Sequence, residues 1–454
     1  MTLGGLIESR DVEQLIRPDE LFFSTTDRQG RIRTGNSVFV RISGFSLTEL
    51  SGAPHNIVRH PEMPAGVFRL VWDRLLLGRP VGAYVLNRAK NGSRYWVFAT
   101  MTPSADGFLS VRVAPQGGLF EQVKQVYLRV NAAERQAAEQ GLGRREVALV
   151  GLRTLERLLH EMGFGSHEEF LTEALTAEVA ARDRLASAGY ARPHARGPIR
   201  QVLAGAEALE TLLGGLVRSL ENYRMLSDRL VRASERVLDV AHRLDGAVAT
   251  ARTASAMVAE TAPVLGNVAR VMAGPMADAV AALERLAPGL TGLRADVTDL
   301  RFRIALASLH NDMIAMFAAE VVDGTAPPTS LREVPLLCDA VRDSVLEMSA
   351  RVTQVNAALR EIVAGVEEAG ERLLAFQRFL GQWRILVMRH RAQGALGDLL
   401  HSIDAEFAAI WQAMDMLRSL GEEFERSAVP FDVEELEAQV ARIRSESSEA
   451  GDLG

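Results

Sequence analysis

The chain has 454 residues, too many for one hydrophobic core, so its length predicts about two to four domains. Hydrophobic residues make up 48% and charged residues 24%, a globular composition that argues against wholesale disorder. The net charge of −7 is uneven, because residues 1–120 hold 14 Lys and Arg against 10 Asp and Glu while the remainder is acidic. An acidic body argues against a nucleic-acid-binding protein, which needs clustered positive charge.

The number of cysteines and the N-terminal residues indicate in which cellular compartment the protein is expected. Cys338 is the one cysteine, which leaves no internal disulfide and no thiolate metal cluster and fits a reducing cytoplasm. Residues 1–10 lack the basic region and long apolar stretch of a signal peptide. Polar side chains interrupt the best candidate for a membrane span, residues 304–322. We therefore expect a cytoplasmic protein with no metal site, no membrane span and no nucleic-acid partner.

Short alternating runs and turn residues in the N-terminal quarter predict a small antiparallel sheet. Asp27-Arg28-Gln29-Gly30 is a turn between two extended runs, and Asn91-Gly92 predicts a two-residue hairpin turn further on. Apolar residues at helical spacing predict a helix between these hairpins, at 68–77. The same patterns predict strands at 21–26, 31–34, 81–87, 95–102 and 107–113.

Alternation along the strand 95–102 gives it two faces. Tyr95, Val97, Ala99 and Met101 share one face, and Trp96, Phe98 and Thr100 share the other. One face must cover a core, and the small Ala99 leaves room for a ligand.

Polar residues near this strand are candidates for the edge of such a ligand site. A flat aromatic cofactor needs an apolar slot with a few polar groups at its edge, and Arg59, His60 and Asn87 are suitable donors. Arg59 is also suited to bind a phosphate. The alternative for each is a structural role, with Arg59 capping a loop and His60 filling the turn before Pro61.

The sequence after Gln116-Gly117-Gly118 has a helical pattern. Residues 120–140 predict one helix and residues 144–187 predict two or three, broken at Gly163-Phe164-Gly165. Heptad stripes typical of packed helices follow at 226–244, 355–387 and 400–417. Breaks that would let these helices fold back antiparallel are expected at Pro288-Gly289, 323–330 and Gln393-Gly394.

Three segments carry a more specific pattern. Residues 56–64 are Asn-Ile-Val-Arg-His-Pro-Glu-Met-Pro, residues 68–79 hold Phe68, Leu70, Trp72, Leu75 and Gly78, and residues 87–97 are Asn-Arg-Ala-Lys-Asn-Gly-Ser-Arg-Tyr-Trp-Val. In this order and spacing they resemble the PAS domain of bacterial aerotaxis receptors, over about a quarter of the chain. The resemblance implies a five-stranded antiparallel sheet with short helices over one face that enclose a small pocket.

Better-known members of that family hold FAD in the pocket and report redox state. The resemblance therefore implies an FAD site with Arg59, His60 and Asn87 lining it and Trp72 and Trp96 as its framework. One position departs from the family, which commonly has Trp shortly after the Gly-x-Pro that starts the fourth strand. Here Gly78-Arg79-Pro80 is followed by Val81, which removes a large aromatic side chain, so an empty or differently filled pocket stays an alternative to FAD.

The expected fold is thus an α+β PAS domain followed by an all-α helical bundle or coiled-coil region. The expected segments are 1–17 (N-terminal segment), 18–116 (PAS domain), 117–188 (connecting helices), 189–198 (linker), 199–322 (first bundle part), 323–330 (linker), 331–441 (second bundle part) and 442–454 (flexible tail).

The leading functional hypothesis is a cytoplasmic signal-transduction protein. Its PAS domain would sense redox state, as in aerotaxis, or a small ligand, and pass the signal to helices that bind a protein partner such as a chemotaxis component. We expect a homodimer, because PAS domains and sustained heptads commonly pair. We expect no enzyme, because kinase, cyclase, P-loop and zinc-protease motifs are missing from the sequence. The alternative is a scaffold protein that uses its PAS domain only for docking or dimerisation.

Overall fold

The computed structural model describes residues 12–185, 189–257, 262–426 and 432–452. The chain forms two compact units, and each combines segments that are far apart in sequence, whereas the expected segments follow chain order. The first unit comprises Met1–Val217, Thr298–Ser349 and Asp432–Gly454, and the second comprises Arg218–Val297 and Ala350–Phe431. Three long helices contribute residues to both units: α7 (Gly197–Met257), α9 (Leu286–Val322) and α10 (Val334–Arg389).

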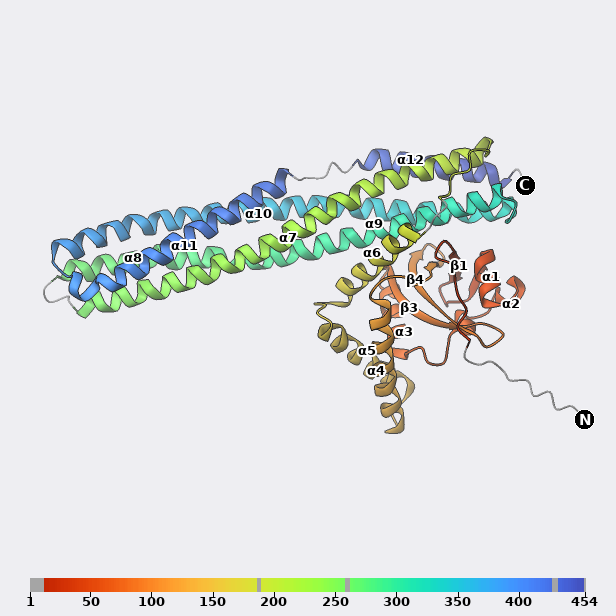
Figure 1. The fold of residues 1–454 in the computed structure, drawn as a ribbon, viewed down its shortest axis with the longest axis horizontal. Coiled ribbons are helices and arrows are strands. Elements are labelled where there is room, and N and C mark those ends of the chain that lie inside the picture. Colours follow the sequence, from red (N-terminus) through yellow and green to blue (C-terminus); the bar gives the residue numbers. More distant parts are fainter. Residues whose placement is uncertain (1–11, 186–188, 258–261, 427–431, 453–454) are drawn as a thin grey trace, which may run out of the picture. The chain divides into compact units, whose positions relative to one another are not determined.

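The first unit contains a five-stranded antiparallel sheet with the strand order β2-β1-β5-β4-β3 (Figure 1). The last strand pairs with the first, so that Leu21 lies opposite Val113 and β1 and β5 are both interior strands. This confirms the predicted five-stranded sheet. Its strands are β1 (Leu21–Asp27), β2 (Ile32–Gly35), β3 (Val81–Arg88), β4 (Arg94–Ser104) and β5 (Gly107–Val113).

Two turns set the strand register, and one of them differs from the prediction. The turn before β2 is confirmed, with Gly30 at a φ of 74° and the Asp27 carboxylate accepting the backbone N–H of Gln29 and Arg31. The predicted two-residue turn at Asn91-Gly92 is wrong in length. Pairing of β3 with β4 ends where Arg88 lies opposite Arg94, so residues 89–93 form a longer loop. The Asn91 side chain shapes this loop by accepting the Ser93 N–H, as turn asparagines do.

Short helices between β2 and β3 lie over one face of the sheet. Asn36 begins the first of them and fastens it to β1, because its Oδ1 accepts the N–H of both Phe39 and Phe23 while its amide donates to Leu21 O. These helices are α1 (Ser37–Ser43), α2 (Leu47–Leu50), the 3₁₀ helix η1 (His55–Val58) and α3 (Ala65–Leu76).

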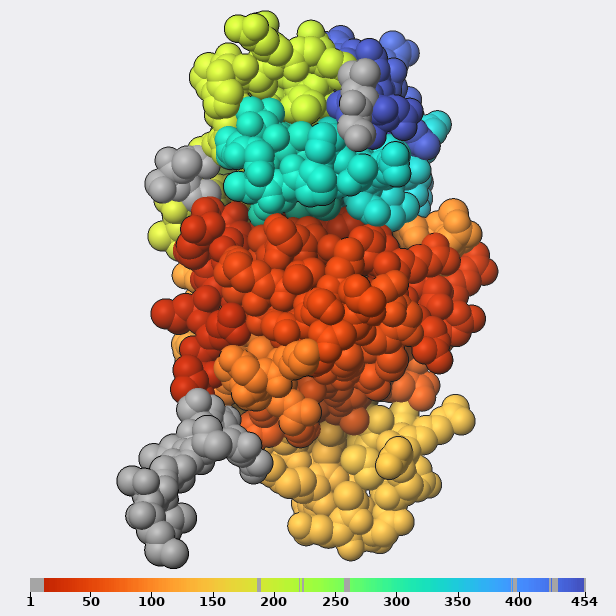
Figure 2. Space-filling model, turned by 90° about the vertical axis from the view of Figure 1, so that its right-hand side faces the viewer, coloured from red at the N-terminus to blue at the C-terminus, as the bar shows by residue number. Residues whose placement is uncertain are grey.

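Later helices cover the other face of the sheet. Trp96 of β4 packs edge to face on Phe120 of α4, with ring centroids 5.4 Å apart, and Phe23 of β1 does so on Phe317 of α9 at 5.3 Å. Figure 2 shows the N-terminal residues, red to orange, against the cyan α9–α10 region. The predicted helices are confirmed, with the break at residues 163–165, as α4 (Phe120–Glu139), α5 (Arg144–Glu161) and α6 (His167–Leu185).

The second unit is a bundle of four antiparallel helical segments (Figure 1), drawn from α7, α8 (Pro263–Glu284) with the start of α9, α10, and α11 (Gln393–Arg426). Arg243 of α7 pairs with Glu406 of α11 at 3.1 Å, and Arg285 pairs with Glu368 of α10 at 3.0 Å. The predicted heptad seams are buried, with Leu244, Leu373, Trp383 and Ile410 all fully inaccessible. Leu400 and Phe407 of the third stripe are only partly buried.

The fold-back predicted at Pro288-Gly289 is wrong. Between α8 and α9 the backbone of Arg285 stays right-handed, with φ −66° and ψ −18°, so the chain does not reverse there. Pro288 lies in the first turn of α9, where its missing N–H has no helical partner to lose. The other two breaks are present, one after Val322 and one at residues 390–392, just before the predicted Gln393-Gly394. By composition one stretch within Pro263–Val322 is apolar enough to cross a membrane, but 78% of it is buried, as in a core helix.

The flexible tail predicted for residues 442–454 is also wrong within the described residues. Helix α12 (Val433–Asp452) continues through it and buries Ile443 and Ser447 completely. Gly451 lies close to Leu331 and Arg332 of the 3₁₀ helix η2 (Pro328–Glu333). Small residues such as Ser447 and Gly451, which suggested a frayed tail in the sequence, instead allow α12 to pack closely against its neighbours.

Candidate functional site

A cavity of about 440 Å³ lies between the sheet and α3 in the first unit. Its volume falls within the range of roughly 300–1,000 Å³ typical of small-molecule sites. Apolar walls come from Val85, Ala99 and Met101 on the sheet and from Phe68 and Val71 on α3. The predicted facing of β4 is therefore confirmed, with Ala99 and Met101 on the cavity side.

Three of the predicted site residues line this cavity. Arg59 does so with its guanidinium 4.3 Å from the centre of the Phe68 ring while Nη2 donates to Met63 O at 2.8 Å, and burial lowers its pKa. The Asn87 residue is 5% exposed, and no described residue hydrogen bonds with its side chain. Trp72 lies at the rim, 36% exposed and edge to face with Phe108.

The other two predicted residues lie elsewhere. His60 fills the turn at Pro61, where its Nδ1 accepts the Glu62 N–H at 3.2 Å, so the structural alternative holds for it. Trp96 lies on the opposite face of the sheet from the cavity, against Phe120 and Tyr127 of α4. Strand alternation is the reason, since Trp96 has the opposite parity to Ala99 in the same strand.

Val81, at the position that departs from the family, is not one of the described residues that line the cavity. It is fully buried at the start of β3, opposite Met101. Residues paired across antiparallel strands share a face of the sheet, and Met101 does line the cavity. The departure therefore lies next to the cavity wall, on the same face of the sheet.

Arg112 is a site residue that the sequence analysis missed. It lies near the end of β5, is 5% exposed and lines the cavity. Its Nη2 donates to Ser24 Oγ at 2.6 Å and lies 2.7 Å from Nε2 of His55. Burial lowers the pKa of Arg112 to about 10, so the guanidinium stays charged at neutral pH. A charged arginine within the predicted strand 107–113, where it is the one charged residue, was the available sign in the sequence.

The neighbouring His55 is held neutral. Burial, and then the positive charge of Arg112, lower the pKa of His55 to about 3. A neutral imidazole can accept a hydrogen bond from the Arg112 guanidinium. The His55 ring also stacks on Phe39, with centroids 5.9 Å apart. His55 thus orients Arg112 without neutralising it.

The charged side chains that line the cavity are arginines as far as the structure describes the chain. Arg59, Arg69, Arg112 and Arg145 line it, and no described Asp or Glu does. Arg69 has a carboxylate partner outside the lining, with Nε 2.7 Å from Asp73. On the floor, Ser110 Oγ is buried with no hydrogen-bond partner among the described residues. The Asn87 side chain, farther along the sheet, also has no hydrogen bond with a described residue, since Asn87 lies opposite Tyr95 and Ser110 lies opposite Met101. Such a cavity fits a ligand with a flat ring, a polar edge and negative charge.

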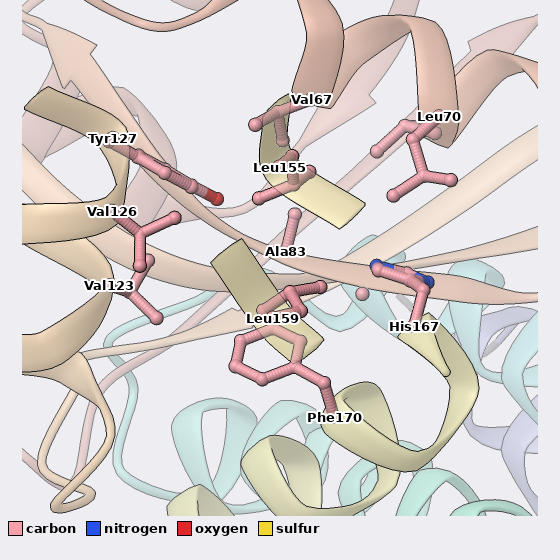
Figure 3. A pocket seen from close by; sticks show the side chains of 12 residues that line it. Val67, Leu70, Ala83, Val123, Val126, Tyr127, Leu155, Leu159, His167 and Phe170 are labelled. Carbon is pink, nitrogen blue, oxygen red and sulfur yellow. The ribbon is translucent and has the colours of Figure 1, made fainter. Parts of the chain in front are cut away.

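A second cavity, of about 10 Å³, lies where α3, β3, α4, α5 and α6 meet (Figure 3). Its lining is apolar apart from His167 and Tyr127. Burial, and then the charge of Arg74, lower the pKa of His167 to about 4, which keeps the imidazole neutral. A volume close to that of one water excludes this cavity as a cofactor site.

The comparisons with known proteins concern the domain that contains the large cavity. The family model described as PAS fold matches residues 32–108. The N-terminal domain is a PAS domain. The aerotaxis receptor of Escherichia coli (strain K12) is 40% identical over 119 residues, 25% of this chain and 24% of that protein. The nitrogen fixation regulatory protein of Klebsiella pneumoniae is 26% identical over 89 residues, 20% of this chain and 18% of that protein.

The chain thus spans about a quarter of the length of the aerotaxis receptor that it matches. A solved structure from work on a flavin analogue and the light-oxygen-voltage domain mechanism aligns with 24% of this chain and 85% of that chain. Its sequence identity is 21% and its TM-score is 0.21, values on which no functional argument can rest. The relatives and the fold support a signal-sensing role for the PAS domain of this chain.

Proposed function

We propose that the chain is a PAS-domain sensor whose cavity binds a flavin, FAD in particular, and passes its state to the helices that follow. One observation carries the proposal: the cavity joins apolar walls to a floor of buried polar groups that lack protein partners. The PAS domain is also 40% identical to a region of an aerotaxis receptor, and aerotaxis is a response to oxygen or redox conditions.

The alternative function, a scaffold protein that uses its PAS domain only for docking, does not explain the buried polar groups on the floor of the cavity. A buried polar group without a partner costs about 1–3 kcal/mol, and a buried charge costs more. Asn87 and Ser110 lie on this floor without side-chain partners among the described residues, and Arg112, which contacts Ser24 and His55, keeps further N–H donors. A ligand with donors and acceptors at several points would satisfy Asn87 and Ser110 and accept from Arg112, whereas a domain used only for docking gains nothing from them.

The residues present fit a flavin. The Asn87 amide offers a donor and an acceptor, Ser110 offers a hydroxyl, and Arg112 offers a charged donor toward carbonyl oxygens. Phe68, Val71 and Met101 supply the apolar slot for a planar ring and exclude water from it. A bound flavin would supply reversible redox chemistry, which this protein's side chains do not.

Helix α3 connects the cavity to the helices that follow the sheet. It supplies Phe68, Val71 and Trp72 to the cavity wall. Its first N–H groups are held by Glu134 of α4, which accepts from Ala65 N at 2.9 Å and from Gly66 N at 2.7 Å. A carboxylate at a helix N-terminus is favoured by the exposed N–H groups and the helix dipole. A shift of α3 on ligand binding would therefore act directly on α4.

The rest of the leading hypothesis stays a proposal. The helical segments would bind a protein partner, a chemotaxis component being the first candidate, and the chain would act without enzymatic activity, in the cytoplasm and as a homodimer. If sedimentation shows a monomer at every accessible concentration, the proposed homodimer is wrong, and the proposed ligand site is unaffected.

The absorbance of the purified full chain, followed by titration with FAD, tests the proposed function. We expect flavin absorbance, either as purified or after FAD is added. Asn87→Ala should weaken FAD binding about ten-fold or more, because it removes a buried hydrogen-bonding group. Asn267→Ala, an exposed change in α8, is the control and should leave binding unchanged. A colourless protein that takes up no FAD would refute the proposal.

A further inference from the structure

The mouth of the large cavity includes a helix that lies outside the matched PAS span. Arg145 and Ala148 belong to α5, beyond residues 32–108, and both line the cavity. The N-terminal turn of α5 is therefore part of the cavity wall. No residue of α5 was expected at the site, because its distance from the sheet in sequence gives no indication of the contact.

Two glycines fix α5 against α3. A Cβ atom added to Gly66 would lie 2.4 Å from the backbone of Gly151, and one added to Gly151 would lie 1.9 Å from Oε1 of Glu134. Neither position accepts a side chain without displacement of backbone or of the buried Glu134, so the two helices are held at close approach. The same Glu134 carboxylate holds the first N–H groups of α3.

From that crossing, steps of three residues lead to the mouth on both helices. On α3 they run forward from Gly66 to Arg69 and Trp72, and on α5 they run backward from Gly151 to Ala148 and Arg145. All four of these residues line the cavity. Since positions three apart share a helix face, the glycine crossing places the start of α5 over the cavity mouth.

The charge at this mouth is only partly balanced by the described residues. Arg145 is exposed, and no described residue hydrogen bonds or forms an ion pair with its guanidinium. Arg69 is half-buried and paired with Asp73, which leaves donors of its planar group unused. With Arg112 on the floor, the cavity has separate positive charge at its inner and outer ends, and none of its described lining residues is acidic.

We propose that the mouth is a phosphate site, in which Arg145 of α5 and Arg69 of α3 bind the phosphate or pyrophosphate group of the cofactor. Guanidinium groups match phosphate oxygens in geometry and charge. That the phosphate belongs to a flavin rests on the proposed function, whereas the phosphate chemistry rests on the charges at the mouth. Helix α5 then contacts the ligand directly, and the site prefers FAD and FMN to riboflavin.

Titration of the full chain with FAD, FMN and riboflavin, followed by flavin fluorescence at low ionic strength, tests this site. Arg145→Gln should weaken FAD and FMN binding about ten-fold or more and leave riboflavin binding unchanged. Arg144→Gln, the adjacent exposed change outside the cavity, is the matched control and should alter none of the three affinities. Equal weakening of all three flavins, or no effect on FAD, would overturn the phosphate site while the flavin proposal stands.

A second arm uses inorganic pyrophosphate alone and needs no flavin. Pyrophosphate should slow amide hydrogen exchange in residues 144–148 of the wild-type chain and not of Arg145→Gln. If pyrophosphate protects this turn while no flavin binds, the phosphate site stands and the flavin proposal fails. If pyrophosphate protects neither protein, the phosphate site fails.

Discussion

The two compact units bury different kinds of side chain. In the second unit the buried positions are almost all apolar heptad residues, and the largest of them, Trp383, donates its indole N–H to Ser255 Oγ at 3.2 Å. In the first unit Arg112, Asn87 and Ser110 are buried around a cavity, and two of them lack protein partners for their side chains. Packing explains most of the interior of the second unit, although Ser227 Oγ and Arg384 Nε are buried there without a hydrogen-bond partner among the described residues. The first holds polar groups that packing does not require, which is the expected sign of a ligand site.

The first unit also holds buried polar groups away from the cavity, on α9. His310 is fully buried and neither ring nitrogen has a hydrogen-bond partner among the described residues. The next two residues are buried as well, with Asn311 donating to Ala206 O at 2.9 Å and Asp312 paired with Arg182. His310 and Asp312 have shifted pKa values because they are buried, so the stability of the first unit should depend on pH.

The largest effect is expected in the apolar seam of the second unit. Leu373→Asp would bury an unpaired charge at a fully inaccessible position and should cost several kcal/mol, on the order of 3–5. Leu374→Asp is the matched control, one residue on and 46% exposed, and should change stability by less than about 0.5 kcal/mol. Urea denaturation measures both. Equal losses in the two variants would show that the heptad stripe is not the buried seam.

A second effect is expected in the first unit at acid pH. Burial lowers the pKa of His310 to about 3, below the 6.5 of an ordinary histidine. Between these values the unfolded chain binds a proton at this histidine that the native chain does not, so His310 lowers stability as the pH drops below 6.5. Asp312 acts in the opposite direction, because burial raises its pKa to about 7 and the native chain then holds the proton. The slope for one histidine is at most about 1.4 kcal/mol per pH unit. His55 and His167 contribute in the same direction as His310.

Replacing His310 isolates its share of that slope. His310→Leu should make the loss of stability below pH 6.5 shallower and should not destabilise the protein at pH 7, because it removes a buried unpaired imidazole. His390→Leu, an exposed change after α10, should leave the slope as in the wild type. Chemical denaturation at several pH values between 4 and 7 compares the three proteins. An unchanged slope in His310→Leu would contradict the account.

Local patterns predicted most of the secondary structure. The alternation and turn at residues 21–34 predicted the first hairpin, and heptad spacing predicted the seam that contains Leu373. The error at Pro288 arose because a proline in a first helical turn resembles a break in sequence. The error at Trp96 was avoidable, since the alternation that directed Ala99 to the cavity directed Trp96 away from it.

The candidate site was only partly predictable, because long-range packing builds it. Arg59, Asn87 and Trp72 came from the family resemblance and line the cavity. Arg112 and Arg145 line it as well, but on β5 and α5, and nothing local shows that β5 pairs with β1 or that α5 crosses α3. Trp72 proved to be a rim residue at 36% exposure, so its truncation should cost less than that of a core tryptophan.

Hydrogen–deuterium exchange of the full chain, with and without FAD, tests most directly whether the unpaired polar groups of the first unit form a ligand site. The account predicts that FAD slows exchange in β5 (residues 107–113), in α3 (residues 65–76) and in the first turn of α5, and leaves α8 (residues 263–284) of the second unit unchanged. A chain that shows flavin absorbance but gains no protection in β5 and α3 would contradict the placement of the site in this cavity.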